Sequence, residues 1–206
     1  MAAYSFSEGS GLTTADSSTN GRTLTLNATT WATGHTGFGL TNTTTGQGAT
    51  GAFIGPATAI SVMAWVRPLN LAGGTTHFAL GFVDSGGNTD VGIFTQRNDF
   101  GTSNVLQCDM RVGGSLKALN GAALTLNTWT HIALTYNGAT IYMYKDGVQV
   151  ATLAATGTVG TGDAFYVAGW SATLPYDTDV DVDDVRVFSS ALSRGQIVYA
   201  MNTPVA

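Results

Sequence analysis

Short runs in which aliphatic and other residues alternate are the feature that most limits what this chain can fold into. In Ile60 to Arg67, an aliphatic residue occupies every second position. Because successive side chains of a strand point to opposite faces, this period of two predicts a β-strand with one apolar face. Pro68 has no N–H group for a strand ladder, so we expect the strand to end there.

Two turn signals divide the block from Trp129 to Leu153 into three further strand-like runs. They are Asn137-Gly138 and Lys145-Asp146-Gly147-Val148. Asn-Gly and Asp-Gly readily adopt the positive φ angles of tight hairpin turns. The block is therefore predicted to form an antiparallel meander of three strands.

The rest of the chain contains more runs of this kind, separated by Gly, Asn, Asp and Thr. The composition agrees, since 27 Gly and 32 Thr stand against one Glu and two Lys, a set that favours strands and turns over long helices. At least ten strands without intervening helices predict a two-sheet sandwich. The additional strands are expected at Leu24–Leu26, Phe38–Leu40, Phe78–Val83, Val91–Gln96, Val105–Val112, Ser115–Leu119, Phe165–Trp170 and Val180–Phe188.

One short helix is predicted near the C-terminus. Ser193 and Gln196 have the Ser-x-x-Gln spacing of a capping box, in which both side chains satisfy free backbone N–H groups. In a helix that starts there, Ile197, Val198 and Met201 are expected to face the sandwich. No repeat and no interdomain linker is visible, so residues 1–206 are expected to form a single domain.

Charge and cysteine content exclude several classes of partner and site. A net charge of −5 and an isoelectric point near 4.8 leave no basic surface for nucleic acid or for anionic membranes. No apolar run approaches the roughly 20 residues that span a bilayer. Cys108 is alone, which excludes an internal disulfide, and its strand-like surroundings predict a small core residue. His35, His77 and His131 lack the spacing of a zinc site.

Four segments along the chain occur in a recognisable order. They are Tyr4–Gly11 followed by Asp16–Gly21, then Ile60–Pro68, then Trp129–Tyr136 through Tyr144–Gly147, and finally Val182–Phe188 with Ala191–Ser193. In this order they resemble the laminin-G-like jelly-roll family, of the concanavalin A-like lectin/glucanase kind. The resemblance implies an all-β, two-sheet antiparallel jelly-roll sandwich. This fold hosts lectins, adhesins, decoration modules and a few hydrolases, so it does not fix the function.

Aspartates occupy every second position of one run, at Asp177, Asp179, Asp181 and Asp183. In a strand, this spacing turns the four carboxylates to one face and the intervening valines to the core. At Asp184 the pattern changes, because Val185 and Val187 continue the apolar face in the other register. A β-bulge at Asp183-Asp184 would reconcile the two registers.

Three interpretations of this aspartate row stay open. The first is a solvated or edge strand whose charges block pairing with another sheet. The second is a structural calcium ion, for which the resemblance implies Asp16 and Asn20 of the loop Asp16–Gly21, with Asp183 and Asp184, as ligands. The third is glycoside hydrolysis, although the resembling glucanases use Glu in this pattern and the one Glu here is Glu8.

Aromatic residues near this row are candidates for ligand contact. Trp170 and Tyr176 bracket the expected loop Ser171–Pro175, and an aromatic ring commonly stacks on the apolar face of a sugar. The alternative is that Trp170 packs against the sandwich, as Trp65 and Trp129 are expected to do.

These features favour a non-catalytic surface protein over an enzyme. We expect a bacteriophage virion decoration or fibre-associated protein that also adheres to glycans, because the domain fills the chain from Met1 to Ala206 and no export signal is visible. Its partners would be glycans or virion structural proteins, in a homo-oligomer or larger assembly on a virion surface built in the host cytoplasm. The alternatives are a secreted or cell-surface carbohydrate-binding module or lectin-like adhesin, and a jelly-roll glycoside hydrolase.

Overall fold

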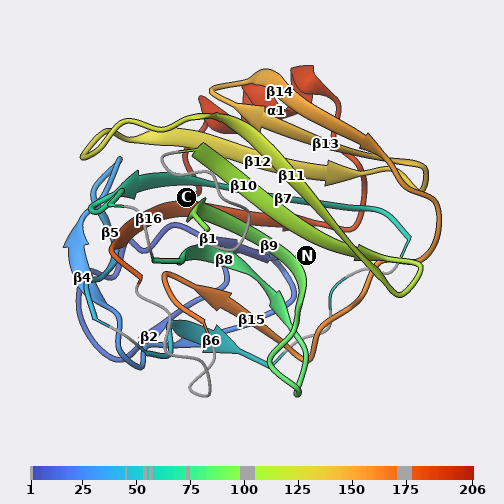
Figure 1. Cartoon of the computed structure of the whole chain (residues 1–206). Helices are drawn as coiled ribbons and strands as arrows, with labels where there is room; N and C mark the ends of the chain where they lie inside the picture. The colour runs from blue at the N-terminus through green and yellow to red at the C-terminus, as the bar shows by residue number, and fades with distance from the viewer. Residues whose placement is uncertain are drawn as a thin grey trace.

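A computed structural model describes residues 2–44, 46–52, 55, 58–72, 75–97, 105–170 and 178–206. These residues form two antiparallel sheets that pack face to face, with one short helix outside them (Figure 1). The all-β, jelly-roll-like sandwich predicted from the sequence is therefore confirmed.

The first sheet, called sheet A, has the strand order β14-β13-β12-β7-β16-β5-β4, and β1 pairs with β16 beside β5. Its strands are β1 (Ala2–Tyr4), β4 (Thr30–Thr33), β5 (Phe38–Asn42), β7 (Ile60–Pro68), β12 (Thr130–Tyr136), β13 (Thr140–Lys145), β14 (Val148–Ala154) and β16 (Val180–Phe188).

The second sheet, called sheet B, has the strand order β11-β10-β9-β8-β15-β6-β3-β2. Its strands are β2 (Thr13–Thr14), β3 (Leu24–Thr25), β6 (Ala49–Gly51), β8 (His77–Val83), β9 (Thr89–Gln96), β10 (Val105–Val112), β11 (Ser115–Ala123) and β15 (Ala164–Val167).

The predicted meander of three strands is confirmed as β12, β13 and β14. Its second turn has positive φ angles at both central residues, 49° at Asp146 and 71° at Gly147. This geometry matches the right-handed twist of the flanking strands and keeps the hairpin tight. In the first turn, the Asn137 side-chain oxygen accepts the N–H of Thr140, which holds the loop closed.

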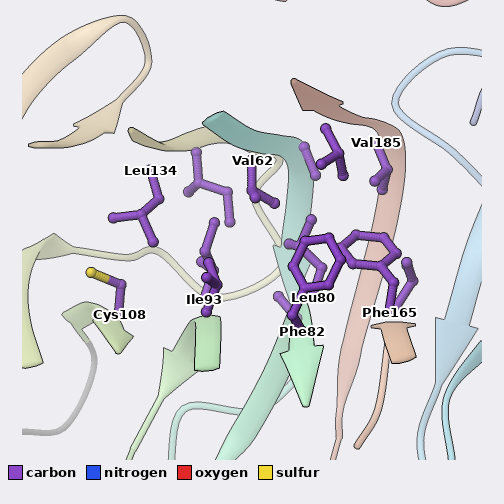
Figure 2. Packing of buried hydrophobic residues seen from close by; sticks show 14 of the residues in the cluster. Val62, Leu80, Phe82, Ile93, Cys108, Leu134, Phe165 and Val185 are labelled. Carbon is purple, nitrogen blue, oxygen red and sulfur yellow. The ribbon is translucent and has the colours of Figure 1, made fainter. Parts of the chain in front are cut away.

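The core lies between the two sheets and is built from the apolar positions of the alternating runs. Figure 2 shows Val62, Leu134 and Val185 of sheet A pointing toward side chains of sheet B. Burial of each such side chain contributes about 1.5–3 kcal/mol, so this interface is the main stabilising term. The sheet B residues labelled there are Leu80, Phe82, Ile93, Cys108 and Phe165. Cys108 is thus a core residue, as predicted, and burial raises the pKa of its thiol.

Strand β16 is a central strand, and this corrects the first interpretation of the aspartate row. It pairs with β7 on one side and with β5 and β1 on the other. A solvated edge strand is therefore wrong. The predicted bulge is confirmed, because the register with β7 shifts between Asp183 and Arg186 and Asp184 has a φ of 52°. Asp177 lies outside the described residues.

Helix α1 (Arg194–Met201) packs on the outer face of sheet A. It begins with the predicted capping box, in which the Ser193 hydroxyl accepts the Gln196 N–H and the Gln196 side chain accepts the Ser193 N–H. Ile197 is fully buried against Met63 and Tyr144, whereas Val198 and Met201 are only partly covered. Within the described ranges, no helix is long and apolar enough to cross a membrane.

Candidate functional site

The outer face of sheet B carries several charged and polar groups on neighbouring strands. In β9 and β10, the core-facing residues alternate with Asp90, Phe94, Asp109 and Arg111, which point away from the core. Because the chain is only 10% charged, this gathering of charged side chains on two neighbouring strands stands out.

An aromatic cluster forms the floor of this face. The ring of Phe78 lies 5.2 Å from that of Phe94 and 4.8 Å from that of Trp170, measured between ring centroids. Gly92 makes room for this packing, because a Cβ atom there would stand only 3.0 Å from Phe94 and 3.1 Å from Phe78. A larger residue at this position would displace the aromatic floor.

Two ion pairs stand on and beside this floor. Arg97 pairs with Asp109, and its guanidinium also lies over the ring of Phe94, 4.8 Å from the centroid. The Arg111 Nε atom lies 3.2 Å from Asp90 Oδ1. Asp90 is fixed on its other side, since Oδ2 accepts the N–H of Gly162 at 2.9 Å. Each arginine is therefore paired with a strand carboxylate, and that of Asp90 is itself fixed by a backbone N–H.

These groups surround an open pocket of about 170 Å³. The hydroxyl of Thr89, a residue only 5% exposed, has no hydrogen-bond partner among the described residues. A buried hydroxyl without a partner costs free energy, so it is a natural contact for a ligand group that enters the pocket. The pocket is lined by Gly87, Asn88, Thr89, Arg97, Asp109, Arg111, Leu116 and Trp170.

The two aromatic candidates from the sequence have different outcomes. Trp170 is 4% exposed and packs against Phe78 and Phe94, as the packing alternative predicts, but it also lines the pocket. Its contribution to a ligand would come from the part that faces the pocket rather than from an open stacking surface. Tyr176 lies outside the described residues, so its role stays a prediction.

The aspartate row lies on the opposite side of the molecule, on the outer face of sheet A. Asp181 is buried and accepts a hydrogen bond of 2.7 Å from Arg67 Nε. Asp179 accepts one of 2.9 Å from the Asn70 side chain. Arg67 also lies over the ring of Trp129, 5.1 Å from its centroid. These carboxylates are thus occupied in holding β16 to the end of β7.

Asp183 and Asp184 are buried where the N-terminal region meets the C-terminal tail. Asp183 Oδ2 accepts the N–H of Thr36 at 2.9 Å, and Asp184 Oδ1 accepts the N–H of Val205 at 3.1 Å. Arg186 pairs with Asp184 at 3.1 Å and also donates to the carbonyl oxygens of Ala200 and Thr203. Burial raises the pKa of Asp183 to about 6.

The four calcium candidates do not form a single set of ligands. The Asp16 carboxylate accepts the N–H groups of Ala3, Ser18 and Arg22, and Asn20 bonds to the Ser18 hydroxyl, so both organise their own loop. Among the described residues, no group of three His, Cys, Asp or Glu side chains is placed to hold a metal.

Asp183 and Asp184 line a separate cavity of about 330 Å³ whose other oxygen-bearing side chains are Ser5, Ser7 and Thr36. Oxygen ligands of this kind suit calcium, although both carboxylates already accept N–H groups. Calcium binding stays a prediction, restricted to this cavity.

His131 lies beneath the same face and is almost fully buried. Its ring stands edge-on to that of Trp65, with 5.4 Å between the ring centroids. The ring of His35 stacks flat on that of Trp65, with 3.6 Å between the centroids. Burial, with smaller effects of the charges of Arg186 and His35, lowers the pKa of His131 to about 3. The ring is therefore a neutral packing element at ordinary pH.

The model of the concanavalin A-like lectin/glucanases superfamily matches residues 41–198, which is more than half of the chain. The chain belongs to this superfamily. The matched region of this superfamily member runs from the end of β5 through most of α1 and includes all the residues that line the pocket on sheet B. Among curated proteins, no sequence matches it.

Solved structures of other proteins share this fold. The binding domain of Paraclostridial Mosquitocidal Protein 1 has a TM-score of 0.74 and 12% identity, over 98% of this chain and 51% of that one. Trypanosoma rangeli sialidase in complex with sialic acid has a TM-score of 0.71 and 17% identity, over 95% and 31%. This chain thus spans about half, or less, of the length of these two proteins.

Domain 4 of AbnA is similar over nearly its whole length. This domain of a GH43 extracellular arabinanase from Geobacillus stearothermophilus, in complex with arabinotriose, has a TM-score of 0.63 and 22% identity. The alignment covers 97% of this chain and 96% of that one. At these identities, all three likenesses show the fold alone.

Sequence reasoning missed Thr89, Arg97, Asp109 and Arg111. A signal was present, because β9 and β10 place charged residues at positions that alternate with core residues. This pattern does not identify a ligand site, because alternating charged and apolar residues occur in any strand with one solvated face. The neighbouring Trp170 follows β15, which pairs with β8 rather than with β9 or β10.

Proposed function

We propose that the protein is a non-catalytic glycan-binding domain whose ligand site is the pocket on the outer face of sheet B. The observation that carries this proposal is a pocket lined by Trp170, by three side chains of two Arg–Asp pairs, and by the Thr89 hydroxyl, which has no hydrogen-bond partner among the described residues. Sugar hydroxyls bond well to guanidinium and carboxylate groups, and the apolar edge of a sugar packs against aromatic or aliphatic side chains.

The size of the pocket supports recognition of a single sugar ring or of a chain end. Its volume of about 170 Å³ is below the roughly 300–1,000 Å³ of pockets that enclose a drug-sized ligand. Leu116, which is 42% exposed, also lines the pocket and adds an apolar contact surface.

The names of the similar structures point to the same class of ligand. Domain 4 of the arabinanase is in complex with arabinotriose, and the binding domain of botulinum neurotoxin serotype D, of similar fold, is in complex with N-acetylneuraminic acid. A glycan ligand for this chain is our extension of these examples.

Binding without hydrolysis is the second part of the proposal. Glycosidases use two carboxyl groups that flank the scissile bond, about 5–9.5 Å apart, one of them as proton donor. Asp90 and Asp109 are each held in an ion pair with an arginine, and the buried Asp181 is paired with Arg67 on the other face. This arrangement favours recognition over acid–base chemistry.

A glycan array followed by calorimetry on the hits tests the proposal, in buffers with and without calcium. We expect binding by the unaltered chain and at least a tenfold loss in Arg111→Ala and in Thr89→Val. Arg194→Ala, the same change on the opposite side of the molecule, is the matched control and should bind normally. No binding to any glycan, or equal binding by all three variants, would contradict the proposal. Release of reducing sugar from the hits would contradict the non-catalytic part.

The surface that displays this domain is proposed from the sequence. We propose a bacteriophage particle, since a chain with 10% charged residues and many Thr and Ala offers a weakly hydrated surface suited to burial in an assembly. Mass spectrometry of purified virions should find the polypeptide in repeated copies. Its absence from virions, with presence in culture medium or on cells, would favour a secreted or cell-surface adhesin instead.

A further inference from the structure

The positive and negative charges around the sheet B pocket nearly balance, and a small excess of negative charge is left. Arg97 is matched by Asp109 and Arg111 by Asp90, in both cases at ion-pair distance. A third carboxylate, Asp84, borders the pocket through the side chain of Asn88, whose amide lies 3.0 Å from Asp84 Oδ2. Neither arginine is left without a carboxylate partner, and the formal charge of these five groups is negative by one.

The pocket groups without a hydrogen-bond partner among the described residues can bind both donors and acceptors. The Thr89 hydroxyl is at once a donor and an acceptor, and it has no partner within the described part of the chain. Arg111 uses Nε for Asp90 and Nη1 for a long contact of 3.5 Å with the Gly114 carbonyl, and no bond of Nη2 is found among the described residues. A sugar hydroxyl can donate to the Thr89 oxygen and accept from Arg111, whereas a carboxylate can accept from both groups but can donate to neither.

A carboxylated sugar would therefore meet an unfavourable field in this pocket. Its charge would compete with Asp90 for Arg111 and would approach Asp84, and opposed like charges at an interface are strongly unfavourable. The whole chain adds to this effect, because its net charge is −5. A neutral polyol is not repelled by these carboxylates and can still form the hydrogen bonds.

We infer that the pocket selects neutral, hydroxyl-rich sugars and discriminates against sugars that carry a carboxylate. This inference rests on the proposed function and names the ligand class of the same site. Sugars such as N-acetylneuraminic acid, which is bound to one protein of similar fold, fall in the rejected class. The anchored ion pairs provide the discrimination, since they hold the guanidinium groups that an acidic sugar would need.

Binding of matched sugar pairs tests the inference. Galactotriose and trigalacturonic acid differ only in the oxidation of C6, and lactose and 3′-sialyllactose differ by one acidic residue. Calorimetry at low and at physiological salt should show at least tenfold tighter binding of the neutral member of any pair that binds. The ratio should shrink as salt increases, because the repulsion is screened.

Variants that remove single charges separate the electrostatic effect on binding from an effect on folding. Asp90→Asn removes the charge that holds the Arg111 guanidinium, and Asp84→Asn removes the charge behind Asn88 while its remaining side-chain oxygen can still accept the Asn88 N–H. Each should raise the affinity for the acidic member at least threefold relative to the neutral one. Asp179→Asn makes the same charge change on the other face and should leave the ratio unchanged. Thermal unfolding identifies a variant that fails to fold, in which case Asp84→Asn alone carries the test.

The outcomes distinguish this inference from the proposed function. Equal or tighter binding of the acidic members would overturn the selectivity and leave glycan binding intact. An unchanged ratio in Asp84→Asn and in a folded Asp90→Asn would overturn the electrostatic origin of the selectivity. Absence of binding to any sugar removes the proposed function and this inference with it.

Discussion

The two outer faces of the sandwich use charged side chains in opposite ways. On sheet A, Asp183 accepts a backbone N–H of the turn at Thr36, and Asp184 and Arg186, which pair with each other, also bond backbone groups of the C-terminal tail. On sheet B, Arg97, Asp109, Asp90 and Arg111 partner one another around an open pocket. The first face joins segments that are far apart in sequence, whereas the second presents polar groups outward.

This difference shows that burial and alternation alone do not identify a ligand site. Both faces carry carboxylates at outward-facing strand positions, and both contain residues that are almost fully buried. Asp183 and Asp184 line a cavity as well, but they and Arg186 bond the turn at Thr36 and the C-terminal tail, and so hold distant segments of the chain together. The pairs Arg97–Asp109 and Arg111–Asp90 join side chains of neighbouring segments of sheet B, and three of these four side chains line the open pocket. The predictions below follow from this distinction.

The largest expected effect is on sheet A. Arg186→Met removes the guanidinium that joins Asp184 to the carbonyl groups of Ala200 and Thr203, and it leaves the buried Asp184 without its cation. Breaking a buried pair in this way costs about 3–5 kcal/mol of unfolding free energy. Chemical denaturation measures it. A loss below 1 kcal/mol would show that the structural role assigned to this face is wrong.

His131→Gln should make the protein less sensitive to acid. The pKa of His131 is lowered to about 3 in the folded state, so the folded state resists protonation and stability falls as the pH drops below the unfolded value near 6.5. The variant lacks this loss and should gain about 1.4 kcal/mol per pH unit relative to the unaltered chain between pH 6 and 4. Asp183, with its raised pKa, acts in the opposite sense in both proteins and cancels in the difference. Parallel pH profiles of the melting temperature would contradict this prediction.

Ser193→Ala tests the comparison at the helix that packs on the outer face of sheet A. The change removes the hydroxyl that caps α1 and should cost about 1 kcal/mol of stability, typical of a lost N-cap. Because α1 lies on sheet A, glycan binding at sheet B should not change. Ser193→Asp, which also caps a helix, is expected to restore most of the stability.

The smallest effect on stability is expected on sheet B. Arg111→Ala breaks an ion pair whose arginine side chain is 31% exposed, and such pairs contribute about 0–1 kcal/mol. The melting temperature should therefore stay close to that of the unaltered chain while sugar affinity falls. If Arg111→Ala were as destabilising as Arg186→Met, the two faces would not differ in the way described.

Local patterns allowed most of the fold to be predicted. The meander, the strand ended by Pro68, the capped helix and the bulge at Asp183-Asp184 each depend on residues within a few positions of one another. The short strands β1, β2, β4 and β6 were not predicted, because two to four residues are too few to show a period. They form through pairing with distant segments, as β1 does with β16.

The candidate site was much less accessible to sequence reasoning. The aspartate row attracted attention because its members are close in sequence, yet Asp181 proved to be tied to Arg67. The pocket instead combines Thr89, Arg97, Asp109 and Trp170, which come from separate strands. Their proximity depends on the pairing of β15 with β8 and of β10 with β9, which no local pattern specifies.

The sequence by itself determined that this chain makes a two-sheet sandwich, because the alternation of apolar side chains fixes which face of each strand is buried. Only the tertiary structure decided which outward charges are structural and which surround a pocket. The physical reason is that an outward-facing charge acquires its role from the partner it meets, and the register between strands distant in sequence sets that partner.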